Sequence, residues 1–282
     1  MTATAPPSPA DYTLEALFIA GALGQLFCIH TFPSHAPPQG VILYAHPFGE
    51  EMNKSRRQVA LQARSFAASG YAVLQCDLSG CGDSAGELTD AEVSRWLDDL
   101  QQARAWLAQR WGADQPCVLW GLRLGATLAV LASQCQSPAP RLLLWQPVLD
   151  GRQFLNQFLR VKLATDILSG AHERTTVAAL WQQWQRGDTI EIGGYLLTAR
   201  LADSIAALDL SQLTPAAPVI WLDVVAEDAT DLTAPRLALV NQWQQQGGAV
   251  TAQVVTGPPF WAMQEIAECA ALITRSCERL AG

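Results

Sequence analysis

The sequence lacks any lysine- or arginine-rich run, and its 18 basic residues are outnumbered by 26 acidic ones, for a net charge of −8. Nucleic acids and anionic membrane faces attract clustered positive charge, so neither is an expected partner. The seven cysteines include no C-x-x-C pair, and their odd number and scattered spacing are typical of reduced, structural thiols. This cysteine pattern favours a cytoplasmic location.

The sequence also lacks an uninterrupted apolar run long enough to span a bilayer. Its most apolar early stretch, residues 14–32, is broken by Glu15, Gly21 and Gly24, so we expect no membrane span. That stretch instead predicts two strands around a turn from Gly21 to Gly24. The small, polar, proline-rich start predicts a disordered tail over residues 1–12 rather than a signal peptide.

Metal and nucleotide motifs are missing as well. His30, His35 and His46 lie on different expected elements, with no His-x-x-x-His or cysteine pair beside them. No G-x-G-x-x-G or P-loop stands at a strand–helix junction. We therefore expect no metal and no cofactor.

What the chain does contain is an alternation of short apolar runs with helical stretches. The expected strands after the hairpin are 41–45, 71–76, 117–120, 141–145, 218–224 and 249–255. The expected helices are 53–69, 89–111, 124–136, 232–246 and 261–280, the second starting with a capping box from Thr89 to Glu92. This alternation predicts the α/β class, with a mostly parallel central sheet flanked by helices.

Residues 150–213 interrupt the alternation with helical sequence that contains tryptophan, glutamine and turn-like glycines. We interpret this segment as a helical cap inserted into one domain, whose core comprises residues 13–149 and 214–282. Open α/β sheets place their ligand crevice outside the carboxyl ends of the strands. The cap is therefore expected over that edge of the sheet.

Two segments that follow expected strands resemble loops of α/β-hydrolases. Residues 77–84 (DLSGCGDS) match a D-x-x-G-x-G-x-S loop that is structural in that fold. Residues 121–125 (GLRLG) stand between an apolar strand and an apolar helix, which is the context of the G-x-S-x-G nucleophile elbow. The resemblance implies the α/β-hydrolase fold, with Arg123 at the position of the catalytic serine.

Arg123 changes the chemistry that the elbow can offer. A guanidinium stays protonated and only donates hydrogen bonds, so it cannot act as the nucleophile. At a helix amino terminus, where backbone N–H groups already favour negative charge, it predicts a site for a small anionic ligand. Alternatively Arg123 pairs internally, because a buried unpaired charge costs about 3–5 kcal/mol. The candidate partners are Glu50, Glu51 and Asp228, and the two interpretations are compatible.

The histidine of a hydrolase triad has no counterpart at its expected place. The last expected strand runs into residues 255–261 (VTGPPFW), and no histidine follows His172. The acid position survives better, with Asp228 the best match and Asp231 the second. Without a base to orient, that acid can serve Arg123 instead.

His46 lies in the sequence HPFGEE, which resembles the H-G loop that helps to form the oxyanion hole of α/β-hydrolases. In that fold the histidine holds the loop. A catalytic His46 partnered by Glu50 or Glu51 is the alternative, because histidine titrates near neutrality. The resemblance also implies ligand contacts for Phe48 and for Leu124, which follows the elbow arginine.

Five segments between Leu17 and Ile273 carry a more specific resemblance. They are residues 46–57, 77–86, 120–125, 145–148 and 257–261. Together they resemble the exosortase A system-associated hydrolase 2 family, in which the arginine elbow is part of the pattern. That family takes its name from its fold and from its occurrence beside exosortase A, a membrane sorting peptidase associated with exopolysaccharide production. The resemblance implies a hydrolase and a functional link to that system, but it supplies no nucleophile.

Two functions follow as hypotheses. The first is a hydrolase with a rearranged site that acts on a small ester, thioester or acylated sugar with an anionic group. Its candidate catalytic residues are His46, Arg123 and Asp228, and its candidate ligand contacts are Phe48, Glu50, Glu51 and Leu124. The second is a non-catalytic binding or accessory protein for an anionic ligand. The sequence does not indicate an oligomeric state.

Overall fold

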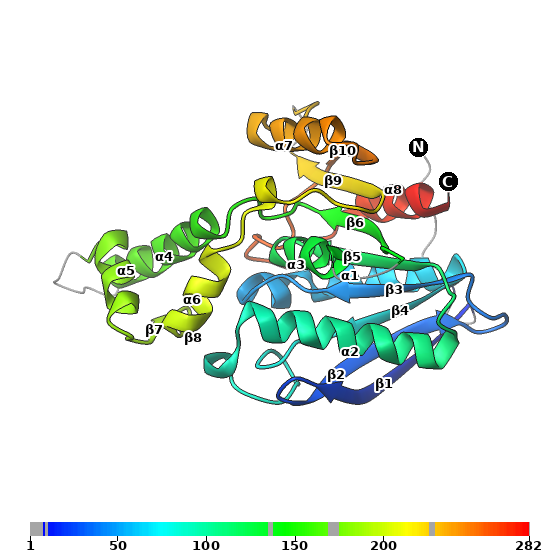
Figure 1. Cartoon of the computed structure of the whole chain (residues 1–282), viewed down its shortest axis with the longest axis horizontal. Helices are drawn as coiled ribbons and strands as arrows, with labels where there is room; N and C mark the ends of the chain where they lie inside the picture. The colour runs from blue at the N-terminus through cyan, green and yellow to red at the C-terminus, as the bar shows by residue number, and fades with distance from the viewer. Residues whose placement is uncertain (1–7, 9–10, 135–137, 169–174, 226–228, 282) are drawn as a thin grey trace.

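The central sheet is mostly parallel. The computed structural model describes residues 8, 11–134, 138–168, 175–225 and 229–281. Within them, eight strands form one sheet in the order β1-β2-β4-β3-β5-β6-β9-β10 (Figure 1). The strands are β1 (Tyr12–Gly21), β2 (Gly24–Pro33), β3 (Gly40–Ala45), β4 (Tyr71–Cys76), β5 (Cys117–Leu122), β6 (Arg141–Trp145), β9 (Val219–Val225) and β10 (Val250–Thr256). The hairpin β1–β2 is antiparallel and β2 pairs antiparallel with β4, whereas the pairs from β4 to β10 are parallel. The predicted hairpin and mostly parallel sheet are confirmed.

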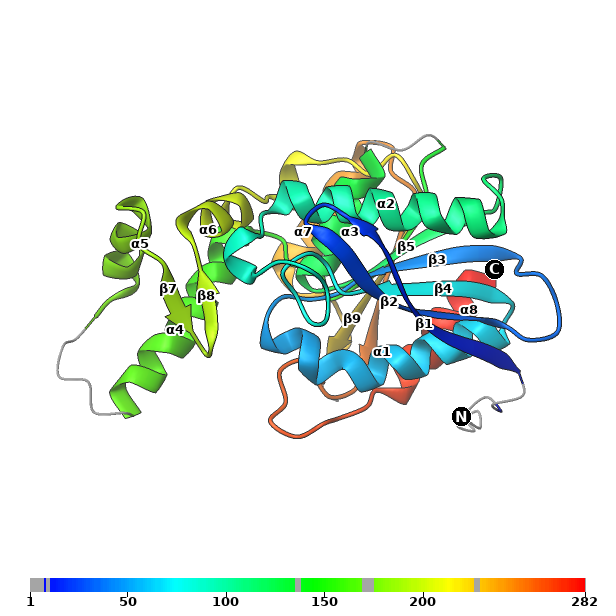
Figure 2. The same cartoon turned by 90° about the horizontal axis from the view of Figure 1, so that it is seen from below.

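Helices cover both faces of this sheet, as the alternation of side chains along a strand requires. The flanking helices are α1 (Glu50–Ala68), α2 (Val93–Trp111), α3 (Leu124–Gln134), α7 (Ala234–Gln245) and α8 (Ala270–Ala281). On β3, Ile42 and Tyr44 belong to the buried cluster shared with α1 and α8, whereas Val41 and Leu43 belong to the cluster shared with α2, α3 and α7. Figure 2 shows α2 on one side of the sheet and α1 with α8 on the other.

A second group of elements stands between β6 and β9. It comprises α4 (Gly151–Leu168), α5 (Val177–Gln185), the hairpin β7 (Ile190–Ile192) and β8 (Tyr195–Leu197), and α6 (Ala199–Ala206). Figure 1 shows these elements projecting from one end of the sheet. Buried side chains such as Phe154, Leu155 and Leu201 join them to the core cluster around α2 and α3. The insertion is therefore packed against the core rather than linked only by its two ends.

The helix expected over 261–280 is wrong in its first half, since only α8 is helical. Phe260 and Trp261 are both buried and their ring centroids lie 5.0 Å apart. Adjacent residues of a helix do not face each other, so burying both rings together requires a non-helical chain. The Gln58 side chain then holds the backbone N–H and carbonyl of Cys269, at 2.8 and 3.0 Å, just before α8 begins.

The capping box expected at Thr89 and Glu92 is also wrong. A short 3₁₀ turn, Leu88–Asp90, precedes α2, and its capping box uses Glu87 and Asp90. Glu92 instead stands at the N-cap of α2 with an extended backbone and no side-chain cap bond. Glu87, Asp90 and Glu92 offered competing starts, and the box closes at the earlier one, where the Glu87 N–H donates to the Asp90 carboxylate at 3.1 Å.

Among the helices that the structure describes, none combines the length and the apolar character that crossing a lipid bilayer requires. Nor does that part of the chain bring together three or more His, Cys, Asp or Glu side chains in a geometry suited to a metal ion.

His30 on β2 makes stability depend on pH. Its side chain is fully buried, and its Nε2 accepts a hydrogen bond from the Trp111 indole at 3.1 Å. Burial lowers the pKa of His30 to about 4, although the Glu15 carboxylate 3.6 Å away opposes this. Unfolding restores an ordinary histidine pKa near 6.5, so the unfolded chain binds a proton more readily between these two values.

We therefore expect the free energy of unfolding to be full above pH 6.5 and to fall by up to about 3 kcal/mol as the pH drops to about 4, at about 1.4 kcal/mol per pKa unit. Urea unfolding of the wild type and of His30→Gln between pH 4 and pH 7.5 measures this. Gln keeps an acceptor for Trp111 but does not titrate, so its curve should be flatter. Parallel curves for the two proteins would contradict the assignment to His30.

Candidate active site

The elbow has the backbone geometry of a nucleophile elbow. Arg123 joins the end of β5 to the start of α3 with a φ of 56°, which a non-glycine residue seldom adopts. Its N–H donates to the Trp145 carbonyl at 2.9 Å, and its own carbonyl accepts from the N–H groups of Ala126 and Val148 at 3.1 and 3.3 Å. The neighbouring loops therefore hold this strained conformation, and the arginine occupies the tip of the turn.

Two glycines make this turn possible. A Cβ added at Gly121 would lie 2.4 Å from the Gly125 carbonyl oxygen, and one added at Gly125 would lie 2.1 Å from the Ala45 carbonyl oxygen. Both obstructing atoms belong to the backbone, which cannot move aside as a flexible side chain can. The G-x-R-x-G spacing thus reflects close contact between β5, α3 and the end of β3.

The Arg123 guanidinium lies between a carboxylate and two aromatic rings. Its Nε donates to both oxygens of Glu51, at 3.1 and 3.3 Å. Its central carbon is 5.9 Å from the ring centroid of Phe154 on α4 and 5.8 Å from that of Trp261. The Arg123 side chain is 14 % exposed, so these contacts take the place of water around a largely buried charge.

Three carboxylates were candidate partners for Arg123 from the sequence. In the structure its partner is Glu51. Burial raises the pKa of Glu51, and the adjacent Arg123 charge opposes that rise. Glu50 instead accepts hydrogen bonds from Asn53 and from the Tyr195 hydroxyl, both at 3.2 Å, and so links α1 to β8 of the insertion. Asp228 lies outside the described residues, so its predicted role stays a prediction.

Both ring nitrogens of His46 are engaged. Nδ1 contacts the Pro47 carbonyl oxygen at 2.7 Å, and Nε2 accepts from the Leu78 N–H at 3.1 Å. One neutral tautomer, with the proton on Nδ1, satisfies both bonds. Burial lowers the pKa of His46, which favours that neutral form. This geometry favours the loop-holding interpretation of His46 over a catalytic one, because His46 joins the loop after β3 to the loop after β4.

The other two predicted ligand contacts, Phe48 and Leu124, are both buried. Phe48 is buried, with ring centroids of Trp96 and Phe158 at 6.0 and 5.4 Å, so it packs the insertion against the core. The Leu124 side chain is also buried, and its backbone N–H begins α3. First-turn N–H groups have no partner within their own helix, so Leu124 can contribute a donor to a ligand through its backbone alone.

The loop at the expected histidine position is tightly packed against the rest of the protein. After β10, the chain passes through Gly257, Pro258 and Pro259 to the buried rings of Phe260 and Trp261. A Cβ at Gly257 would lie 2.3 Å from the Cys269 sulfur, so the loop is tightly fitted. Through Trp261, the segment that carries the histidine in related folds here contacts the elbow arginine instead.

A second buried ion pair lies near the elbow, and the sequence analysis did not predict it. Asp223 on β9 is 2 % exposed and pairs with Arg236 on α7 through Nε–Oδ2 and Nη1–Oδ1 contacts of 3.1 Å each. The Trp221 indole also donates to Asp223, at 2.8 Å. Burial raises the pKa of Asp223 and lowers that of Arg236, and the Arg123 charge acts on both groups. An aspartate in the middle of an apolar strand was the signal that could have revealed this pair.

Arg123 and Arg236 line one cavity of about 270 Å³ between the elbow, α4 and α7. Gln153 and Gln157 of α4 add amide groups to its wall, and Asp150 adds the only carboxylate among the described lining residues. Two guanidinium groups, two amides and one carboxylate make a polar site suited to an anion.

The sequence of the chain matches a known protein family over most of its length. The family model described as X-Pro dipeptidyl-peptidase (S15 family) matches residues 26–243, from β2 to α7. The matched segment includes the elbow, the insertion and both ion pairs. No curated protein matches the chain.

Solved structures with similar folds include a carboxyl esterase and a serine hydrolase. Est1E from Butyrivibrio proteoclasticus with bound ferulic acid has a TM-score of 0.69 at 15 % identity, covering 94 % of this chain and 98 % of that one. A thermostable carboxyl esterase from Bacillus coagulans with glycerol gives 0.58 at 16 %, covering 87 % and 90 %. An α/β serine hydrolase without a lid from Xanthomonas campestris gives 0.53 at 16 %, covering 98 % and 94 %. These similarities confirm the predicted α/β-hydrolase fold.

Proposed function

Because this chain belongs to the X-Pro dipeptidyl-peptidase (S15) family and has the α/β-hydrolase fold, we propose that it is a hydrolase in which Arg123 and Glu51 replace the serine–histidine pair. Its proposed substrate is a small ester, thioester or acylated sugar with an anionic group. Arg123 binds that anionic group, and Glu51 acts as the general base for water.

The free donors of Arg123 carry this proposal. Within the described part of the chain, its guanidinium donates hydrogen bonds only through Nε, to Glu51. The two Nη groups are left for a ligand in the cavity that Arg123 lines. A guanidinium edge of this kind binds a carboxylate or phosphate through paired hydrogen bonds.

The proposed reaction needs no covalent intermediate. Glu51 accepts a proton from water while the water oxygen adds to the acyl carbon, and the Leu124 N–H donates to the developing oxyanion. Collapse of the tetrahedral intermediate breaks the bond to the alkoxide or thiolate, which takes the proton back from Glu51. A buried carboxylate with a raised pKa suits this role because it is a stronger base than an exposed one.

Substrate charge tests the role of Arg123. We expect the wild type to prefer a 4-nitrophenyl ester of succinate with a free carboxylate over the matching methyl-capped diester, by about tenfold to a hundredfold in kcat/KM. This range corresponds to about 1.5–3 kcal/mol for a hydrogen bond to a charged group. Arg123→Gln should remove the preference by lowering kcat/KM for the charged ester only. Steady-state kinetics on both esters and their thioester analogues measures this.

Arg275→Gln is the matched control, since Arg275 lies on α8 and pairs with Glu278 at 3.0 Å. It should keep the wild-type preference. Circular dichroism and melting curves establish that Arg123→Gln is folded, because removing one partner leaves Glu51 unpaired. An equal preference in the wild type and Arg123→Gln would overturn the proposed role of Arg123.

A non-catalytic anion-binding protein is the second candidate. The hydrogen bonds of His46 favour it, because both ring nitrogens of that histidine are engaged and neither is free to act as a base. If the wild type turns over none of these esters or thioesters, the hydrolase proposal fails. Stabilisation by succinate that is absent in Arg123→Gln would then support binding alone.

We propose in addition that the protein is cytoplasmic and works beside an exosortase A system. The arginine elbow and the four other motifs that resemble that family support the functional link, and the scattered cysteines support the location. Deleting the gene should then alter exopolysaccharide production in a host with such a system, and unaltered production would contradict the link.

A further inference from the structure

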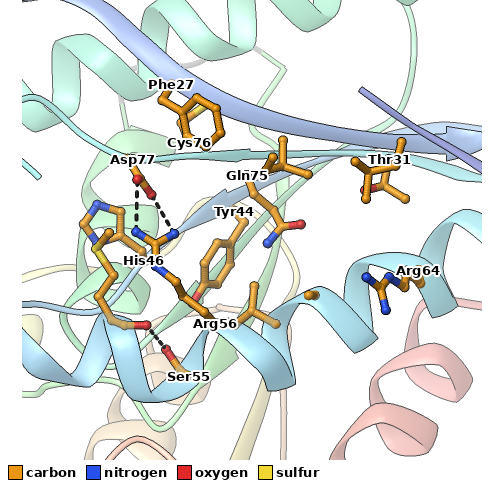
Figure 3. A pocket seen from close by; sticks show the side chains of 15 residues that line it. Phe27, Thr31, Tyr44, His46, Ser55, Arg56, Arg64, Gln75, Cys76 and Asp77 are labelled. Atoms are coloured by element: carbon orange, nitrogen blue, oxygen red, sulfur yellow. Dashed lines mark hydrogen bonds and ion pairs between the residues drawn. The ribbon is translucent and has the colours of Figure 1, made fainter. Parts of the chain in front are cut away.

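A second cavity of about 270 Å³ lies away from the Arg123 site, between α1 and the strands β2, β3 and β4. Figure 3 shows Arg56 and Asp77 at one end, Arg64 and Thr31 at the other, and Tyr44 with Gln75 between them. Apolar side chains such as Ile29 and Val59 make up much of the rest of its wall. Nothing in the proposed reaction uses this space.

Tyr44 contributes a hydroxyl group that lacks a partner. The residue is 4 % exposed, and its hydroxyl forms no hydrogen bond within the described residues. The Ser55 hydroxyl on the same wall donates instead to the Glu51 and Met52 carbonyls, at 2.8 and 3.1 Å. A buried polar group without a partner is unfavourable, so natural proteins usually satisfy it with a side chain, a water molecule or a ligand.

Arg64 leaves a second donor without a partner. Its Nε is buried, and no hydrogen bond or ion pair of its guanidinium occurs within the described residues. Arg56 differs, because it forms a two-bond pair with Asp77 at 3.0 and 3.2 Å. The uncompensated positive charge of this cavity is therefore the one on Arg64.

The two orphaned groups are well separated. The Tyr44 hydroxyl lies beside the Ser55 side chain without a hydrogen bond of ordinary geometry, and Arg64 follows Ser55 by nine residues on α1. At 1.5 Å per residue, the backbones of Ser55 and Arg64 are about 13 Å apart along α1. A cavity of about 270 Å³ has room for a small organic molecule. An elongated ligand that is polar at both ends matches this arrangement.

We propose that this cavity binds a small aliphatic carboxylic acid that carries a hydroxyl or carbonyl oxygen at the opposite end of its chain. Its carboxylate pairs with Arg64, its chain lies along the apolar wall, and its far oxygen bonds the Tyr44 hydroxyl. This site is independent of the Arg123 cavity and of the proposed hydrolysis.

Three probes of similar length test the proposal: 6-hydroxyhexanoate, hexanoate without the hydroxyl, and 1,6-hexanediol without the carboxylate. Binding is measured by thermal shift and calorimetry in the Arg123→Gln protein, which removes binding at the elbow. We expect 6-hydroxyhexanoate to bind about tenfold more tightly than either of the other compounds. Equal affinities for the three compounds, or no binding of any, would overturn the proposal.

Variants locate the binding in this cavity. Tyr44→Phe should reduce 6-hydroxyhexanoate to the affinity of hexanoate, and it should raise the melting temperature of the free protein because an orphaned hydroxyl is removed. Arg64→Gln should reduce 6-hydroxyhexanoate to the affinity of the diol. Ala60→Leu should abolish binding by filling the space, whereas Ala68→Leu at the exposed end of α1 should leave it intact. Binding that survives Ala60→Leu would contradict this location.

Discussion

Replacing Glu51 by Gln should lower kcat for ester and thioester hydrolysis by about 10²–10⁴-fold with little change in KM, as is typical for loss of a general base. The amide oxygen of Gln can still accept a hydrogen bond from the Arg123 Nε, as the Glu51 carboxylate does at 3.1 Å. It cannot take a proton from water. Glu51→Gln therefore removes the general base while it keeps the hydrogen bond that holds the Arg123 guanidinium.

The dependence of kcat on pH gives a second measurement of the same role. Glu51 must be ionised to act, so kcat should rise with pH through the pKa of Glu51, which burial places above its ordinary value. The rise should be absent from the residual activity of Glu51→Gln. Glu278→Gln on α8 is the matched control and should keep both the wild-type kcat and the profile. A Glu51→Gln protein with wild-type kcat would exclude Glu51 as the base.

Gly125→Ala should reduce the free energy of unfolding by about 3 kcal/mol or more, near the upper end for overpacking a close contact. The added Cβ would lie 2.1 Å from the Ala45 carbonyl oxygen and 2.5 Å from that of His46. Relief of this clash would have to push α3 away from the end of β3. The same movement would displace Arg123, so anion binding should weaken together with stability.

Urea unfolding measures this effect, with Gly193→Ala as the control. Gly193 has a φ of 58° and open space around its Cβ position. Gly193→Ala should therefore lower the free energy of unfolding by only about 1–2 kcal/mol, which is the cost of placing a side chain on a left-handed backbone. If Gly125→Ala lowers the free energy of unfolding by no more than Gly193→Ala does, the close contact between α3 and the carbonyls after β3 does not determine stability.

The sheet was predictable because its evidence is local. Strands β4 and β6 have the limits that the sequence indicated, since buried parallel strands are short apolar runs bounded by turn residues. The helix expected over 261–280 was partly wrong because its first half follows the inward packing of Phe260 and Trp261. That packing depends on the distant Arg123 and Gln58, which no local pattern reveals.

The site was predictable only as a set of residues. Glu50 and Glu51 are adjacent on α1, so their side chains point about 100° apart, and the rotation of the helix decides which one faces Arg123. A sequence does not give that rotation. The pair Asp223–Arg236 joins a strand to the following helix, and it was missed because Asp223 lies inside a strand that was interpreted only as core.

The contacts around Arg123 determine what a serine at this position would require of its neighbours. Serine at position 123 would restore a nucleophile, yet it would leave Glu51 buried without its cation and Trp261 facing an empty volume. Histidine in the loop of Pro258 and Pro259 would be of no use until that serine existed. A serine–histidine pair at this site would therefore require coordinated changes at positions 51, 123 and 261 and in the loop of Pro258 and Pro259, so no single substitution could build it.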